Sequence, residues 1–269
     1  MAAAARAAHL IVDDEPLIFA DALAEAMLGE RADELIEYHR AHGTHPVLAG
    51  ARAQVTCRSR YTEDSLARAV RRGVSQYVVL GAGLDSFAYR SALARHLKVF
   101  EVDHPATQEY KRRIRPAPGG LTFVPVDLTV DSLRDGLGRA GFDAAEPAFV
   151  GWLGGTMYLD PGAVEHTVFV LGGFAPGTEL VIDFMLPPGL RDAAGEMYAE
   201  LVGQASAERG EPWLSVFAPD AMAGLLTRHG FGTIRDVRQR DMIPAGAWDR
   251  SDSLRPAELS RIAHATTSP

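Results

Sequence analysis

Short apolar runs recur through the middle of the chain, and stretches with helical spacing separate them. The apolar runs cover residues 77–80, 98–102, 122–126, 148–152 and 179–184. The helical stretches cover residues 85–96, 104–114, 131–140 and 161–172. Short strands that alternate with helices predict βαβ units and a mostly parallel sheet, covered by helices on both faces. We therefore expect an α/β fold.

Helical patterns also fill the N-terminal part of the chain. Apolar residues recur at helical spacing over residues 17–28, and Gly29 is expected to end that helix. The same spacing predicts helices over residues 31–41 and 62–72. Thr62 is expected to be the N-cap of the last one, because its hydroxyl can accept a hydrogen bond from a free backbone N–H.

Beyond the fifth apolar run, the pattern predicts helices over residues 190–209 and 219–229 and a strand over residues 231–238. The remainder of the chain has only a weak pattern. No linker-like segment divides the chain, so we expect a single domain. Its parts are a helical cap (1–72), a ligand-binding core (73–184), a helical insertion (185–218) and a C-terminal part of the same fold (219–269).

Composition and charge narrow the classes of partner. The 269 residues carry a formal net charge of −8, and 47% of them are hydrophobic, enough to bury a sizeable core. A negative surface repels phosphate backbones and anionic lipids, so we expect neither a nucleic acid nor a membrane as a partner. No apolar run is long enough to span a bilayer, which favours a cytoplasmic protein. The composition leaves the oligomeric state open.

The cysteine and histidine residues, which are the types that most often bind zinc, offer little support for a metal site. The single cysteine, Cys57, cannot form an internal disulfide or a multi-cysteine zinc site, and we expect its thiol to be buried. Residues 39–45 hold three histidines, but a glycine and a proline interrupt the helix there. We interpret this segment as a solvated loop and expect no metal.

The first strand pattern ends in a glycine-rich turn, Gly81-Ala82-Gly83, which can approach a ligand closely or simply connect a strand to a helix. A dinucleotide-binding turn has a third glycine, and that position here is Ser86. Asp85 also places a negative charge where a phosphate would bind at the start of a helix. The turn therefore favours a neutral or cationic ligand over a diphosphate, which counts against an NAD-type dehydrogenase.

Acidic residues mark the ends of the next two strand patterns. Glu101 and Asp103 both have a suitable spacing from Gly81 to accept hydrogen bonds from ribose hydroxyls, and Asp103 lies nearer the strand end. Asp127 follows the third strand and can accept a hydrogen bond from an exocyclic amine such as that of adenine. Helix capping is the simpler alternative for these acids. Together the three strand ends suggest a nucleoside without a phosphate, a description that fits S-adenosylmethionine.

Several segments in a fixed order carry a family resemblance. They are Arg58-Ser-Arg-Tyr-Thr-Glu-Asp64, Val78-Val-Leu-Gly-Ala-Gly-Leu-Asp-Ser-Phe-Ala-Tyr-Arg90, Val99-Phe-Glu-Val-Asp-His-Pro105 with Lys111-Arg112, Val124-Pro-Val-Asp-Leu128, Met157-Tyr-Leu159 and Gly210-Glu-Pro-Trp-Leu-Ser215. From about residue 15 to about residue 240 the chain resembles the leucine carboxyl methyltransferase-like family, whose bacterial members are described as S-adenosylmethionine-dependent O-methyltransferases. The resemblance implies a class I methyltransferase fold, which is Rossmann-like, with S-adenosyl-L-methionine as the cofactor.

The resemblance also implies roles for the matched positions. Arg58 would pair with the methionyl carboxylate of the cofactor, since a guanidinium can bind a carboxylate through two hydrogen bonds, and Arg60 is its rival. The other cofactor-binding positions are Gly81, Ala82, Gly83 and Asp85 in the turn beside the methionyl part, Asp103 at the ribose, and Asp127 and Leu128 at the adenine.

One position departs from the family pattern. Many relatives have an acidic residue followed by glycine after strand four, whereas this chain has Leu153 before Gly154. The change removes one polar contact near the amino group of the cofactor or near the acceptor. A protein of this fold that binds the cofactor without transferring methyl, as a scaffold or a cyclase, is therefore the alternative.

Candidates for the acceptor side come from the segments around the core. Tyr158 follows strand four and is expected to position the acceptor, and packing in the core is its simpler alternative. Glu211 and Trp213 lie in the insertion, where a pocket wall is expected. We expect O-methylation of a small-molecule carboxylate or hydroxyl, in secondary metabolism. A carboxylate acceptor needs no base, whereas a phenol or enol benefits from one.

Overall fold

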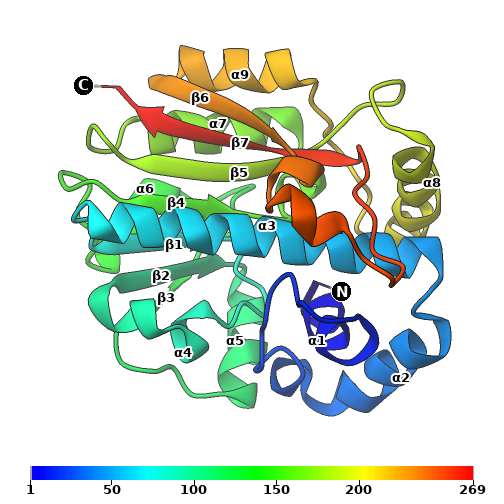
Figure 1. The fold of residues 1–269 in the computed structure, drawn as a ribbon. Coiled ribbons are helices and arrows are strands. Elements are labelled where there is room, and N and C mark those ends of the chain that lie inside the picture. Colours follow the sequence, from blue (N-terminus) through cyan, green and yellow to red (C-terminus); the bar gives the residue numbers. More distant parts are fainter. Residues whose placement is uncertain (1, 269) are drawn as a thin grey trace.

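The computed structural model describes residues 2–268, which form one seven-stranded sheet with helices on both faces (Figure 1). The strands are β1 (Gln76–Leu80), β2 (Lys98–Asp103), β3 (Leu121–Pro125), β4 (Phe149–Trp152), β5 (Glu179–Met185), β6 (Phe231–Arg238) and β7 (Ser260–Thr267). Their order is β3-β2-β1-β4-β5-β7-β6, and β7 runs antiparallel to the other six strands. The chain reverses its direction of travel across the sheet between β1 and β4, which is where open α/β sheets bind ligands.

Two helical layers enclose the sheet. The α-helices are α1 (Ala2–Val12), α2 (Ala32–His42), α3 (Pro46–Arg71), α4 (Phe87–Arg90), α5 (Pro105–Ile114), α6 (Leu133–Arg139), α7 (Pro161–Gly172), α8 (Ala193–Glu208) and α9 (Pro219–Arg228). Side chains from α6, α7 and α9 pack on one face of the sheet, and side chains from α3 and α4 pack on the other. The long helix α3 crosses the near face in Figure 1, with α8 at one of its ends and α1 and α2 beside it.

The predicted parallel strands are confirmed, each to within one residue at either end, and the strand over residues 231–238 is confirmed as β6. Every residue of β1, β4 and β5 is buried, as the continuous apolar runs indicate. The weak C-terminal pattern concealed β7, in which Arg261 and His264 interrupt the apolar residues. This strand forms because β5 and β6 pair with it on both sides, and a local pattern does not record such pairing.

The helix expected over residues 17–28 is wrong. That segment consists of turns followed by a short 3-10 helix (Ala26–Arg31), inside which Gly29 has a φ of +59°. The Asp21 carboxylate accepts a hydrogen bond from Leu23 N (3.2 Å), a local turn that competes with a helix. Five apolar residues of the segment are nevertheless buried, namely Ile18, Phe19, Ala24, Met27 and Leu28.

The helix start expected at Thr62 is also wrong. Thr62 lies within α3, where its hydroxyl donates a hydrogen bond to the Arg58 carbonyl one turn earlier (2.8 Å). The helix begins instead at Pro46, with the His45 side chain as its N-cap. Buried Cys57 packs on the sheet from the middle of this helix, which confirms the prediction of a buried thiol.

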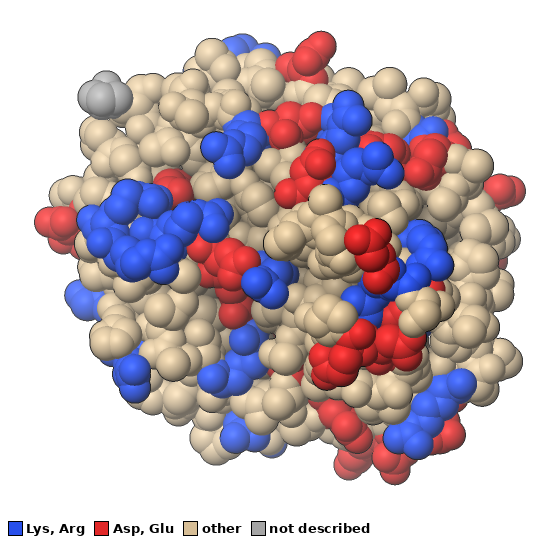
Figure 2. Space-filling view, viewed as in Figure 1, with Lys and Arg blue, Asp and Glu red and all other residues tan. Residues whose placement is uncertain are grey.

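On the face seen in Figure 2, acidic and basic side chains occur in separate groups, and the broadest basic group lies at the left of the view. Within residues 2–268, no helix combines the length and the apolar character needed to cross a bilayer.

Candidate functional site

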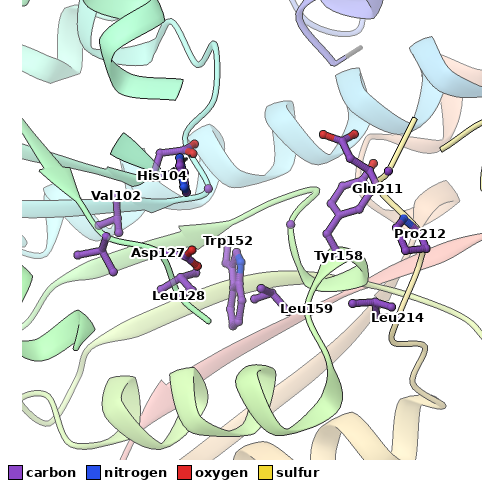
Figure 3. A pocket seen from close by; sticks show the side chains of 15 residues that line it. Val102, His104, Asp127, Leu128, Trp152, Tyr158, Leu159, Glu211, Pro212 and Leu214 are labelled. Atoms are coloured by element: carbon purple, nitrogen blue, oxygen red, sulfur yellow. Dashed lines mark hydrogen bonds between the residues drawn. The ribbon is translucent and has the colours of Figure 1, made fainter. Parts of the chain in front are cut away.

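A pocket of about 550 Å³ opens at the carboxyl ends of the parallel strands (Figure 3). One side, which we call the strand-end wall, consists of Gly81, Val102, Asp103, His104, Val126, Asp127, Leu128, Trp152 and Gly155. The other side, the loop wall, consists of Tyr158, Leu159, Gly210, Glu211, Pro212 and Leu214. The sheet therefore brings the predicted strand-end residues to one cavity.

The glycine turn after β1 is bound to the end of β2. Gly81 and Gly83 have φ values of +62° and +49°, a conformation that glycine adopts at little cost. The Gly83 N–H donates to the Asp103 carboxylate (2.5 Å), and the Ala82 N–H donates to the Val102 carbonyl (3.2 Å). Of the three turn residues only Gly81 lines the pocket. Ala82 and Gly83 therefore set the shape of the turn and form no part of the pocket surface.

The two acids of β2 separate into different environments. Asp103 lines the pocket, and its second carboxylate oxygen accepts from His104 N (2.7 Å). Glu101 is buried beneath, where it pairs with Lys111 (2.6 Å between Oε2 and Nζ). Burial raises the pKa of Glu101 to about 7. Asp103 is therefore the acid that a ligand can reach, and Glu101 serves the packing of α5 against β2.

Asp127 faces the pocket above an apolar floor. Its Oδ1 accepts from the hydroxyl and the N–H of Thr129 (2.6 and 2.9 Å), and these bonds lower the pKa of Asp127. The carboxylate is therefore ionised at neutral pH and can accept a further hydrogen bond. The floor beside it is formed by Val102, Val126 and Leu128.

Asp85 lies outside the pocket lining. Its Oδ1 accepts from Phe87 N (2.7 Å) at the start of the short helix α4. The structure thus places it at a helix start, which is the simpler role of such an acid, and its part in cofactor binding stays a prediction.

Arg58 also lies behind the pocket lining, in a buried ion pair that the sequence analysis missed. Its Nη1 donates to Asp183 Oδ2 (2.6 Å), and the other oxygen of Asp183 accepts from Gly154 N (2.7 Å). Gly154 has a φ of +72°, and a Cβ there would lie 2.5 Å from Arg58 Nη2. Its rival, Arg60, is about half exposed and pairs with Asp64 on the surface.

The N-terminal cap holds the turn from its other side. Arg6 donates to the carbonyl of Leu84 and to the carboxylate of Asp21 (both 2.8 Å). Buried Ser86, which stands where a dinucleotide turn would have glycine, donates to the same carboxylate (2.7 Å). These contacts bind the cap to the glycine turn. They join distant segments, and no sequence spacing predicted them.

The loop wall is pinned by hydrogen bonds to the short 3-10 helix at Thr156–Tyr158. Leu214 N donates to the Met157 carbonyl (2.7 Å), and the Ser215 hydroxyl donates to the Thr156 carbonyl (2.8 Å). The segment that follows α8 is therefore held over the carboxyl end of β4.

Two predicted acceptor-side residues face the pocket and a third does not. Tyr158 is 38% exposed, and Glu211 is also exposed. Both stand at the end of the pocket opposite His104 and Asp127 (Figure 3). Trp213 packs instead into a small separate core. Tyr158 is therefore not packed in the core, which was its simpler alternative, and lies on the loop wall instead.

The charges in the pocket are of one sign. Its lining includes the carboxylates Asp103, Asp127 and Glu211, and none of the described lining residues is a lysine or an arginine. No cluster of metal-binding side chains occurs within residues 2–268. A phosphate or diphosphate would find no lysine or arginine among the described lining residues, whereas hydroxyl and amine donors would find acceptors.

Comparisons with known proteins agree with this arrangement. The family model described as "Leucine carboxyl methyltransferase" matches residues 1–171. A Bacillus subtilis protein named "Putative S-adenosyl-L-methionine-dependent methyltransferase YktD" is 32% identical over 77% of this chain and 70% of its own length. A Mycobacterium tuberculosis relative with the same description is 32% identical over 93% of this chain and 89% of its own length.

Solved structures share the fold at low sequence identity. A DUF574 family protein from Streptomyces avermitilis has a TM-score of 0.61 and 14% identity, covering 98% of this chain and 97% of its own. Human N-acetylserotonin methyltransferase, solved with S-adenosylmethionine, has a TM-score of 0.50 and 12% identity, covering 86% of this chain and 58% of its own. The fold is thus the class I methyltransferase fold, and the chain belongs to the leucine carboxyl methyltransferase family.

Proposed function

We propose that this chain is an S-adenosyl-L-methionine-dependent O-methyltransferase whose acceptor is a small molecule with a hydroxyl group. One observation carries the proposal: a single pocket joins a strand-end wall bearing Asp103 and Asp127 to a loop wall bearing Tyr158 and Glu211. The names of the relatives support the cofactor, and the chemistry of the two walls supports the acceptor.

The strand-end wall fits the nucleoside part of the cofactor. Asp103 can accept from ribose hydroxyls, Asp127 can accept from the exocyclic amine, and the apolar floor suits the base. The lack of a lysine or arginine among the described lining residues suits a nucleoside without a phosphate. Arg58 remains our proposed partner of the methionyl carboxylate, because one guanidinium can bind two carboxylates along different edges.

The loop wall favours a hydroxyl acceptor over a carboxylate. Glu211 would repel an anionic acceptor, and no lysine or arginine of the described lining offsets that repulsion. A hydroxyl can instead donate its proton to a carboxylate. The sequence left both a carboxylate and a hydroxyl acceptor open. The negative charge of the pocket lining is our reason to propose the hydroxyl.

The residues of the loop wall would act on the acceptor oxygen. When bound, the cofactor supplies a methyl group activated by its positively charged sulfur. Tyr158 would orient the acceptor by a hydrogen bond. Glu211 would take the hydroxyl proton as the acceptor oxygen bonds to the methyl carbon and the bond from that carbon to sulfur breaks, which would leave a neutral thioether. The pinned segment between Gly210 and Leu214 would limit the access of water to this end of the pocket.

Two measurements test the proposal in turn. Calorimetry should show binding of S-adenosylhomocysteine and no binding of NAD. Transfer of labelled methyl from S-adenosylmethionine should then be measured on matched alcohols, phenols and carboxylic acids with the same carbon skeleton. Labelling of the hydroxyl compounds alone is the expected result. Labelling of the acids alone would overturn our choice of acceptor, and binding without transfer to any class would favour the scaffold or cyclase.

A further inference from the structure

The indole N–H of Trp152 is a buried donor without a partner. The residue ends β4, its side chain is fully buried, and no described residue accepts a hydrogen bond from its Nε1. Trp152 nevertheless lines the pocket, and Figure 3 shows its ring between Asp127 on one side and Tyr158 on the other. Folded proteins rarely leave such a donor unsatisfied, so the position calls for an acceptor atom from a ligand.

Gly155 lies against this edge of the indole, whose nitrogen is buried. A Cβ at this position would lie 3.0 Å from Trp152 Nε1 and 3.5 Å from Cδ1. The backbone of Gly155 has φ −119° and ψ −31°, which side chains of any kind tolerate, so its conformation does not require glycine. What the missing side chain avoids is a Cβ in close contact with the buried N–H.

The surroundings identify the part of a ligand that would meet the N–H. Apolar Val102, Val126 and Leu128 form a surface suited to a flat ring, and Asp127 offers a carboxylate beside it. A site with one N–H donor, one carboxylate acceptor and an apolar surface complements a base that has ring nitrogens and an exocyclic amine. Adenine has these features.

We propose that the indole N–H of Trp152 donates a hydrogen bond to a ring nitrogen of the adenine base of the cofactor, and that Gly155 keeps the approach open. The inference rests on the proposed function, since it assumes that the cofactor binds. It adds to Asp127 and Leu128 a nucleoside-binding residue, and it makes the end of β4 part of the base recognition.

Binding of S-adenosylhomocysteine, measured by calorimetry, tests the proposal with two different changes. Trp152→Phe keeps an aromatic ring and removes the donor, and we expect the affinity to fall about five- to twentyfold. Gly155→Ala keeps the donor and covers it, and a loss of similar size is expected. The control is Trp248→Phe, whose indole donates to the Arg240 carbonyl away from the pocket and whose loss should leave the affinity unchanged.

The partner atom is found with analogues of S-adenosylhomocysteine that lack one ring nitrogen, namely the 1-deaza, 3-deaza and 7-deaza compounds. The wild-type protein should bind one of them about as weakly as Trp152→Phe binds the parent compound, and the variant should not distinguish that analogue from the parent. Equal losses for every analogue in both proteins would overturn the proposal.

The outcomes separate this inference from the proposed function. If the wild-type protein binds no S-adenosylhomocysteine, the proposed function fails. If it binds and both variants bind as tightly, only the role of Trp152 is wrong. Circular dichroism melting of each variant checks its folding, and should Trp152→Phe unfold, Gly155→Ala alone decides between the outcomes.

Discussion

The two walls of the pocket are built in different ways. Residues of the strand-end wall occupy the carboxyl ends of parallel strands, so the sheet itself sets their positions, as the bond from Gly83 to Asp103 shows. The loop wall depends on a segment between α8 and α9 that hydrogen bonds pin to a short 3-10 helix. The comparison teaches that the sheet provides a general ligand-binding edge. The segment between α8 and α9 determines which acceptor can bind beside that edge.

The strongest test of this division is Arg58, which joins the cap to the sheet. Arg58→Ala leaves the buried Asp183 side chain without its charged partner, so the free energy of unfolding should fall by about 3–5 kcal/mol. Urea denaturation measures this loss. Arg60→Ala is the matched control on the same helix, and its exposed pair with Asp64 should contribute at most about 1 kcal/mol.

The same variant tests the cofactor role of Arg58. At a temperature where the variant is folded, the affinity for S-adenosylhomocysteine should fall at least about tenfold, as expected for loss of a charge-assisted pair. Unchanged affinity in the folded variant would leave Arg58 with a purely structural role and would remove it from the cofactor site.

Asp103 should have the next largest effect, because it combines a ribose contact with support of the glycine turn. Asp103→Ala is expected to weaken binding of S-adenosylhomocysteine by about 30- to 150-fold, as the loss of about 2–3 kcal/mol implies. Calorimetry provides the measurement, and Glu109→Ala, an exposed acid on α5, provides the control. Equal affinities for the two variants would show that the strand-end wall does not hold the nucleoside.

The strand-end wall could be predicted because its signals are local. An apolar run followed by glycine or an acid specifies both a buried strand and the residue at its end, as for Gly81, Asp103 and Asp127. Asp183 had a signal that was not used, since it is a carboxylate between the apolar residues Ile182 and Phe184 in a strand that is buried along its whole length. Such a group needs a partner, and the sequence did not identify Arg58 as that partner.

Other features could not be predicted because they depend on contacts between distant segments. Arg6 meets Leu84 only after the N-terminal helix has packed beside the turn, and β7 exists only between two partner strands. The orphaned N–H of Trp152 depends on the path of the chain at Gly155. Patterns of hydrophobicity record which residues are buried, and they do not record what those residues touch.

Glu211 tests the loop wall separately from the strand-end wall. Glu211→Gln should lower kcat for a hydroxyl acceptor at least about tenfold through loss of a proton acceptor, while the affinity for S-adenosylhomocysteine stays within about twofold. Steady-state kinetics as a function of pH provide the measurement, and phenols of lower pKa should be affected less. Glu208→Gln on α8, outside the pocket lining, is the control. A parallel loss of cofactor affinity would contradict the division into two walls.

The smallest expected effect concerns the support of the loop wall. Helix α8 leans on α3, where the Tyr198 ring lies close to Gly50, and α3 is in turn held by a buried network of polar side chains. In that network Arg52 binds the Asp13 carboxylate through two hydrogen bonds (2.7 and 2.8 Å) and lies 3.4 Å from His39 Nδ1. Protonation of His39 beside the Arg52 guanidinium should therefore destabilise this network as the pH falls.

The solvated loop expected over residues 39–45 is wrong for His39, which is buried on α2. Its titration provides the measurement of that effect. Burial and the nearby Arg52 lower its pKa to about 4 in the folded chain, against an ordinary value of about 6.5 when unfolded. Its contribution to stability is therefore present above pH 6.5 and is lost as the pH falls toward 4. Between pH 7.5 and 5.0 the melting temperature of the wild-type protein should fall about 2–4 °C more than that of His39→Asn. His42→Asn, an exposed histidine on the same helix, should follow the wild-type curve, and identical slopes for all three proteins would show that His39 has no part in this dependence.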